Sequence, residues 1–329
     1  RLLGLSTQSI RVADLLWRLL TVSGFFALLW TVYRRMNVAV WAAGLFYAVV
    51  GTLTFSKGWT SAQTESFMEL PLILCFLAAY LALDTEAQRP VAWMLASGAA
   101  CGLATSIKPT GLFPVAALAL YCSVELLGRR MRLVGAVRLL SVFLIGTVLA
   151  LVPFAAYFWA EGAMGDMLDI VWTFNRYNAH QTPLQAFVNI LVSFYVGIWY
   201  GLRKFDLWYA GALFGLLVIV LRTARNQRPM MLMVWWLITA YVSVALQGKF
   251  FPYHWIVIAA PLSLLAGHGV DWFVHLLATL NRRWVTVLGV LLLVVGSVSS
   301  IQRANPWQIP VFLGRRLGIM GVEEMKARM

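Results

Sequence analysis

Two glutamates at the start of a very apolar segment are the first candidates for chemistry. Glu65 and Glu69 lie in the stretch SAQTESFMELPLI (61–73), four residues apart, so a helix would place both on one face. At the mouth of a membrane helix, Glu65 could bind a polar acceptor, coordinate a divalent metal ion or only complement the helix macrodipole. Glu69 lies one turn deeper, where an unpaired carboxylate costs on the order of 2–3 kcal/mol. We therefore expect Glu69 to line a polar cavity, with pairing to a nearby cation as the alternative.

Residues that could bind a phosphate follow two other apolar runs. Lys108 lies in GLATSIKPTGLFP, and Lys249, Tyr253 and His254 lie in QGKFFPYHW. A lysine can hold a phosphate as a point charge, and a phenol or an imidazole can stabilise its leaving oxygen. The alternative interpretation is a pair of snorkelling lysines beside an aromatic belt at the membrane surface.

A further polar set lies in the stretch NRYNAH (175–180). Its Arg176 and Tyr177 could line a cavity or hold an acceptor. A solvated loop at the membrane interface is the alternative.

The elements that must position these residues are membrane helices. The chain of 329 residues is 61% hydrophobic and only 12% charged, whereas a soluble protein carries about a quarter charged residues. Apolar runs of about 18–20 residues alternate with short basic loops, which indicates an all-α polytopic bundle. The net charge of +13 comes mainly from these loops, so it does not indicate a nucleic-acid partner.

We predict ten membrane spans in this chain. The segment 187–205 is apolar and aromatic but ends in Arg203 and Lys204, so we predict an interfacial helix there instead of a span. The predicted spans are 15–33, 38–55, 66–83, 91–107, 110–127, 139–160, 207–221, 230–247, 253–270 and 284–301.

The distribution of basic residues predicts the orientation of the bundle. One set of alternating loops holds 12 Lys and Arg residues, against six in the opposite set, and cytoplasmic loops carry the excess. The basic loops are YRRMN (33–37), DTEAQRP (84–90), GRRMRLVGAVR (128–138), RTARNQRP (222–229) and NRR (281–283). Glu65, Lys108, Lys249 and His254 would then share the opposite, extracytoplasmic face.

The motifs of common soluble enzymes do not occur in the sequence. It has no P-loop, no HExxH and no GxSxG pattern, which argues against a transporter subunit that hydrolyses its own nucleotide. The three cysteines lie inside apolar runs without metal-ligand spacing, so we interpret them as packing residues.

The order of the motifs resembles the GT-C membrane glycosyltransferases. QTESF opens a helix, GLATSIKPTGLF forms a turn, FNRYN lies in a long outer loop, and GKFFPYHWIVIAAPLSLLAG follows. The bacterial branch related to protein O-mannosyltransferases, lipid A aminoarabinose transferases and rhizobial lipopolysaccharide glycosyltransferases is the most similar. The resemblance covers about residues 1–270 and implies a GT-C-like domain at 1–301 with an outer-side tail at 302–329.

The resemblance also implies a reaction. The family transfers a sugar from a polyprenyl-phosphate donor to a lipid, glycan or protein acceptor outside the cytoplasm, usually with inversion at the anomeric carbon. Lys108 and Lys249 match its basic positions, and Glu65 matches its second acid. The main catalytic Asp or Glu, with the helix before it, would precede Arg1; a true loss of that segment would leave an inactive relative. The resemblance implies no certain cofactor. A divalent metal ion bound at Glu65 is the open alternative.

These expectations leave other functions open. A secondary transporter or flippase of lipid-linked glycans would show inverted repeats and charges at the membrane midplane. A glycan ligase or polymerase of another fold would depend on outer-loop arginine and histidine residues such as Arg176.

The distribution of the resembled family favours the bacterial inner membrane as the location. The chain would then contact membrane lipid, and its site would face the periplasm or exterior.

Overall fold

The computed structural model is almost entirely helical over the residues that it describes. These are residues 7–34, 36–51, 63–84, 88–174, 182–204, 206–221, 228–248 and 252–279, with positions 287, 289 and 291. Within these ranges, seven helical segments are long and apolar enough to cross a membrane. The predicted all-α class is therefore confirmed, and the seven apolar segments are compatible with a helical membrane bundle.

The seven segments cover seven of the ten predicted spans. The predicted spans 38–55 and 207–221 appear as shorter apolar helices, α2 (Val38–Leu45) with η1 (Phe46–Gly51), and α11 (Asp206–Leu221). The predicted span 284–301 and the tail 302–329 lie outside the described residues, apart from the three isolated positions. The long segments are α1 (Thr7–Tyr33), α4 (Thr64–Leu83), α5 (Pro90–Ile107), η2 (Pro109–Leu112) with α6 (Phe113–Leu127), α7 (Leu133–Ala160), α12 (Arg228–Gln247) and η4 (Pro252–Ile258) with α13 (Ala259–Ala278).

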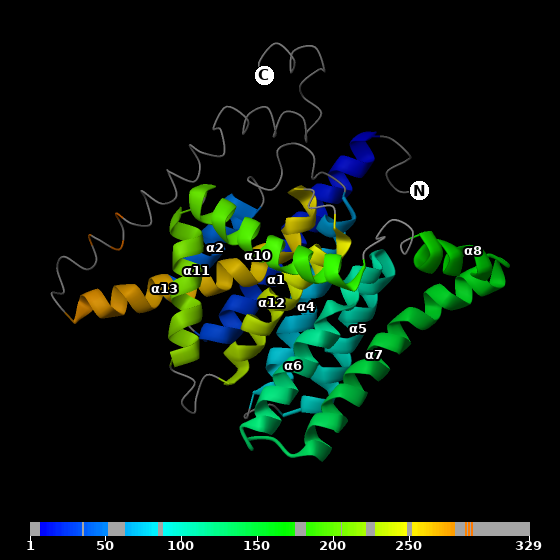
Figure 1. Ribbon diagram of the computed structural model, residues 1–329, viewed down its shortest axis with the longest axis horizontal. Helices are drawn as coiled ribbons and strands as arrows, with labels where there is room; N and C mark the ends of the chain where they lie inside the picture. Colours follow the sequence, from blue (N-terminus) through cyan, green and yellow to red (C-terminus); the bar gives the residue numbers. More distant parts are fainter. Residues whose placement is uncertain are drawn as a thin grey trace, which may run out of the picture.

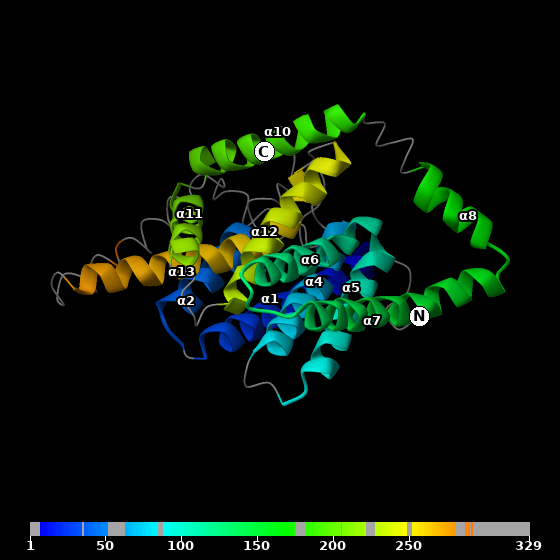
Figure 2. The same cartoon turned by 60° about the horizontal axis from the view of Figure 1, so that its bottom comes forward.

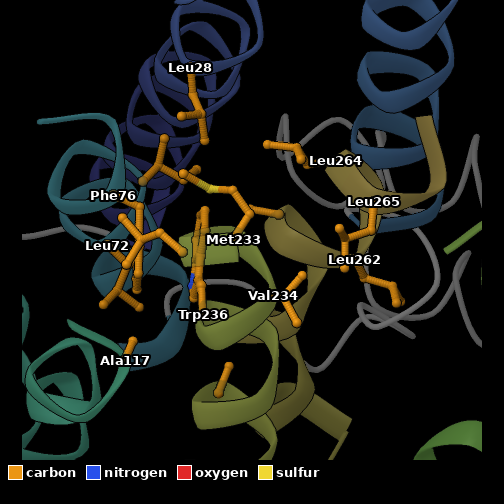
Figure 3. Packing of buried hydrophobic residues seen from close by; sticks show 14 of the residues in the cluster. Leu28, Leu72, Phe76, Ala117, Met233, Val234, Trp236, Leu262, Leu264 and Leu265 are labelled. Atoms are coloured by element: carbon orange, nitrogen blue, oxygen red, sulfur yellow. The ribbon is translucent and has the colours of Figure 1, made fainter. Parts of the chain in front are cut away.

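Helix α4 lies at the centre of the bundle, where it packs against α1, α5 and α12 (Figures 1 and 2). Its Phe76 ring stacks on Trp236 of α12, with ring centroids 4.2 Å apart and planes tilted by only 8°. Leu72, Phe76 and Met233 meet in the same buried cluster (Figure 3). These contacts fix the axial position of α4 relative to α12 and so the height at which their ends meet.

Glycines allow two pairs of helices to pack backbone to backbone. A Cβ on Gly98 of α5 would lie 1.9 Å from the Phe143 carbonyl oxygen of α7, and one on Gly146 would lie 2.2 Å from the Leu95 oxygen. Helices α11 and α13 meet similarly at Gly215 and Gly269. Close approach at small residues is how helices gain packing contacts in lipid, where burial of apolar surface gives little drive.

Helix α10 (Pro183–Lys204) has a different orientation from its neighbours. It runs across α12 and at a steep angle to α11 (Figures 1 and 2). Phe194 packs on Tyr241 of α12 with ring centroids 5.0 Å apart, whereas Leu184, Leu191 and Tyr195 are exposed. This arrangement suits the interfacial helix predicted for 187–205, although its position relative to a membrane stays a prediction.

The two ends of α4 carry different polar contacts. At its C-terminal end, Arg34 forms an ion pair with Asp84, so these two residues of the predicted basic loops lie at the same end of the bundle. At its N-terminal end lies Glu65. On the periphery, α7 continues into α8 (Met164–Leu168) and η3 (Asp169–Phe174), away from the packed helices (Figure 2).

The contact between α5 and α7 generates a stability prediction. Gly98→Ala should lower the free energy of unfolding by about 1–3 kcal/mol, because the new methyl group must displace the α7 backbone. Denaturant unfolding of the detergent-solubilised protein measures this change. Gly165→Ala in α8 is the matched control, since nothing lies within 4 Å of the added Cβ. Equal stability of the two variants would contradict the close packing.

Candidate functional site

Glu65 lies in the first turn of α4 with its side chain turned into the protein. Gln63 before the helix is extended, and its carbonyl oxygen accepts hydrogen bonds from the amides of Ser66 and Phe67. The Thr64 hydroxyl donates to Oε2 of Glu65 at 2.9 Å. Only 1% of the Glu65 surface is exposed. A carboxylate that only complements the macrodipole would face solvent, so this burial requires a charged partner.

Lys108 supplies that partner from the end of α5. The helix ends there because the backbone of Lys108 is extended. Pro109 follows, and it has no amide N–H that could donate a helical hydrogen bond. The Lys108 ammonium forms an ion pair with Oε1 of Glu65 and donates to Oε1 of Gln247, at the end of α12, at 2.6 Å. Its side chain is 24% exposed, so the cation is the more accessible member of the pair.

His254 approaches the same carboxylate from η4, just before α13. Its Nε2 lies 3.7 Å from Oε1 of Glu65, and the residue is buried. The ring of Tyr253, which is partly exposed, meets His254 edge to face at a centroid distance of 4.6 Å. Lys108 from the end of α5 and His254 from η4 therefore reach the carboxylate at the start of α4, and Gln247 from the end of α12 joins them through Lys108. We call Glu65, Lys108, Gln247 and His254 the Glu65 cluster.

The structure brings together several of the residues that the sequence singled out. Glu65, Lys108 and His254 are in contact, and Tyr253 adjoins them through His254. Their chain separation is large, so this juxtaposition arises only from the packing of the bundle. Lys249, Arg176 and Tyr177 lie outside the described residues.

Glu69 has a different set of neighbours. Its carboxyl group hydrogen-bonds with the Tyr47 hydroxyl of η1 and lies near the charge of Arg18 from α1. The residue is 8% exposed, and its Oε1 atom has no hydrogen-bonding partner. The two glutamates, which their four-residue spacing places on one face of the helix, therefore have different neighbours. Glu65 faces Lys108 and His254, whereas Glu69 faces Tyr47 and Arg18.

Sequence reasoning missed several members of these polar contacts. Gln247 is the last residue of an apolar helix, and a polar residue at that position was the signal in the sequence that could have identified it. In α1, Arg18 pairs with the buried Asp14 at 3.3 Å and donates to Ser66 of α4 at 3.0 Å. Two opposite charges four residues apart within an apolar run were the signal for this pair.

The donor atoms near Glu65 suit anion and hydroxyl binding better than metal binding. No group of three or more His, Cys, Asp or Glu side chains that could hold a metal ion occurs among the described residues. In the Glu65 cluster, the Lys108 ammonium contacts the same carboxylate oxygen that faces His254. An ammonium at that oxygen would repel a divalent cation, which does not favour the metal alternative for Glu65.

Comparisons with protein-family models, curated proteins and solved structures gave no match to this chain. The Glu65 cluster combines one carboxylate acceptor with an ammonium, an amide and an imidazole in a largely buried setting. Such a set can bind an anion through the donors and a hydroxyl through the carboxylate.

Removal of one partner of the Glu65–Lys108 pair should be more harmful than removal of both. Lys108→Met leaves a buried carboxylate without its cation and should destabilise the protein by about 3 kcal/mol. The double variant Lys108→Met with Glu65→Gln should recover most of that loss. Denaturant unfolding of the wild type, both single variants and the double variant gives the coupling energy. Purely additive effects would show that the pair does not interact in solution.

Proposed function

We propose that this protein is a membrane glycosyltransferase that moves a sugar from a polyprenyl-phosphate donor to a lipid, glycan or protein acceptor. The observation that carries the proposal is the convergence of Glu65, Lys108 and His254 at one end of an apolar helix bundle. The resemblance of the motifs around these residues to GT-C glycosyltransferases supports it. We propose that the site faces away from the cytoplasm, because Arg34 and Asp84 of two predicted basic loops lie at the other end of α4. The bacterial inner membrane follows from the resemblance alone.

The proposed roles follow from the chemistry of each group. Lys108 holds the donor phosphate, with Lys249 as a second cation assigned from the sequence. His254 and Tyr253 stabilise the negative charge that develops on the leaving phosphate oxygen. Glu65 acts as the second acid and accepts a hydrogen bond from the acceptor hydroxyl.

The bond changes in the proposed transfer are simple. The acceptor oxygen forms a bond to the anomeric carbon, and the bond from that carbon to the phosphate oxygen breaks. The phosphate leaves with the bonding electron pair, and the acceptor proton passes to a carboxylate. Exposed apolar side chains along α7 and α10 provide a surface suited to the polyprenyl chain.

One observation favours a transporter or flippase as the second candidate. Asp14, Arg18 and Glu69 lie within apolar helices at the α1–α4 contact. Ionisable groups in membrane spans often mark a path for a polar substrate. A transporter would move lipid-linked sugar between leaflets without breaking the sugar–phosphate bond.

Glu65→Ala tests the proposed function directly. In the full-length protein in nanodiscs, the variant should transfer sugar from a panel of tritiated isoprenyl-phosphate sugars about 100-fold more slowly, because one carboxylate of the site is lost. Glu125→Gln is the control, since Glu125 is also buried but lies near Arg130 at the other end of α6. Undiminished transfer by a folded Glu65→Ala variant would contradict the assignment of Glu65 to the site. Movement of intact donor between leaflets would favour the transporter.

Lys249→Ala tests the second cation. Loss of one charge-assisted hydrogen bond to phosphate should raise the apparent donor KM about 10-fold while the acceptor KM changes little. Initial transfer rates at varied donor and acceptor concentrations separate the two constants. An unchanged donor KM would remove Lys249 from the proposed phosphate site.

A further inference from the structure

The ammonium of Lys108 is already occupied by protein groups. It contacts Oε1 of Glu65 and Oε1 of Gln247, so two of its three N–H donors have partners. The third donor can bind one phosphate oxygen, and a second phosphate oxygen would compete with Glu65 and Gln247 for the other two. The carboxylate of Glu65 therefore stands in the place of the anion that Lys108 is proposed to bind.

The two members of this pair differ in accessibility. Glu65 is 1% exposed, whereas the Lys108 side chain is 24% exposed. An incoming anion can reach the lysine before it reaches the carboxylate. A lysine side chain has four rotatable carbon–carbon torsions and makes no fixed bidentate contact, so its ammonium can move between two neighbouring anions.

The remaining neighbours can hold Glu65 after Lys108 moves. The Thr64 hydroxyl donates to Oε2, and His254 Nε2 lies 3.7 Å from Oε1. The carboxylate would keep the hydrogen bond from Thr64 but lose the Lys108 ammonium. Its Oε1 atom would then be free to accept a hydrogen bond from an acceptor hydroxyl.

We propose, on the basis of the function proposed above, that Glu65 and Lys108 form an autoinhibitory contact that the donor phosphate opens. The phosphate takes Lys108 from Glu65, and the released carboxylate binds the acceptor hydroxyl. Donor binding thus precedes productive acceptor binding. Without a donor, the carboxylate stays paired and the site does not activate water or acceptor.

This inference predicts an unusual effect of a charge-removing substitution. Glu65→Gln should bind an isoprenyl phosphate about 10-fold more tightly than the wild type, because the phosphate no longer competes with a carboxylate for Lys108. A merely structural ion pair predicts the opposite, since loss of Glu65 would leave Lys108 poorly placed and weaken binding. The direction of the change therefore separates the two roles.

The experiment is a calorimetric titration of farnesyl phosphate into the full-length protein in nanodiscs. The wild type should bind, Glu65→Gln should bind more tightly, and Lys108→Gln should bind about 10-fold more weakly. In the Lys108→Gln background, Glu65→Gln should no longer improve affinity. Glu125→Gln is the matched control, because it removes another buried carboxylate near the far end of α6. Its affinity for farnesyl phosphate should equal that of the wild type.

A second variant keeps the test sharp if Glu65→Gln does not fold. Gln247→Leu removes the other acceptor of the Lys108 ammonium and should also tighten binding, by about 3-fold, because a neutral hydrogen bond is weaker than a charged one. Thermal unfolding identifies the folded variants before titration.

The outcomes distinguish the inference from the function on which it rests. Weaker or unchanged binding in folded Glu65→Gln, with weaker binding in Lys108→Gln, overturns the autoinhibitory contact but keeps Lys108 as the phosphate site. If farnesyl phosphate binds neither the wild type nor Glu65→Gln, or if Lys108→Gln binds as well as the wild type, the proposed phosphate site fails as well.

Discussion

The burial of the Glu65 carboxylate is the constraint on which the arrangement of the helix ends depends. An ionised carboxylate inside an apolar bundle is unstable unless a cation and hydrogen-bond donors reach it. Lys108 supplies the cation and Thr64 a hydrogen bond, and His254 Nε2 lies 3.7 Å from the carboxylate, so residues far apart in the chain meet at Glu65. The ends of α4, α5 and η4 must therefore lie at one height, which ties local chemistry to the global packing.

The bundle meets that requirement through contacts far from the site. The stack of Phe76 on Trp236 sets the position of α12 against α4, so that Gln247 lies beside Lys108. The close contact of α5 with α7 at Gly98 supports the helix that presents Lys108. In lipid these contacts act mainly through shape and dispersion, because apolar burial contributes little between membrane helices. Small changes in helix spacing would accordingly alter the geometry around Glu65.

The two ends of the bundle have different electrostatic character. At one end, Arg34 pairs with Asp84 and remains largely exposed, as expected for a loop pair in water. At the other end, Lys108 and Glu65 interact in a buried setting where each charge depends on its partner. Coulombic attraction is stronger where water is excluded, and the desolvation cost is also larger. The proposed exchange of Glu65 for a phosphate at Lys108 depends on this buried setting.

The sequence by itself determined the helical class, the main apolar segments and the residue types suited to phosphate and hydroxyl chemistry. Glu65, Lys108 and His254 could be singled out because each interrupts or borders an apolar run, where polar groups are costly. Seven of the ten predicted spans appear as long apolar helices, and two more appear as shorter apolar helices within the described residues. Only the tertiary structure decided that Glu65 and Glu69, on one face of α4 by spacing, contact different partners, and that Gln247 and Arg18 join them. The physical reason is that helical periodicity fixes directions within one helix, whereas contacts between helices depend on how their side chains fit together.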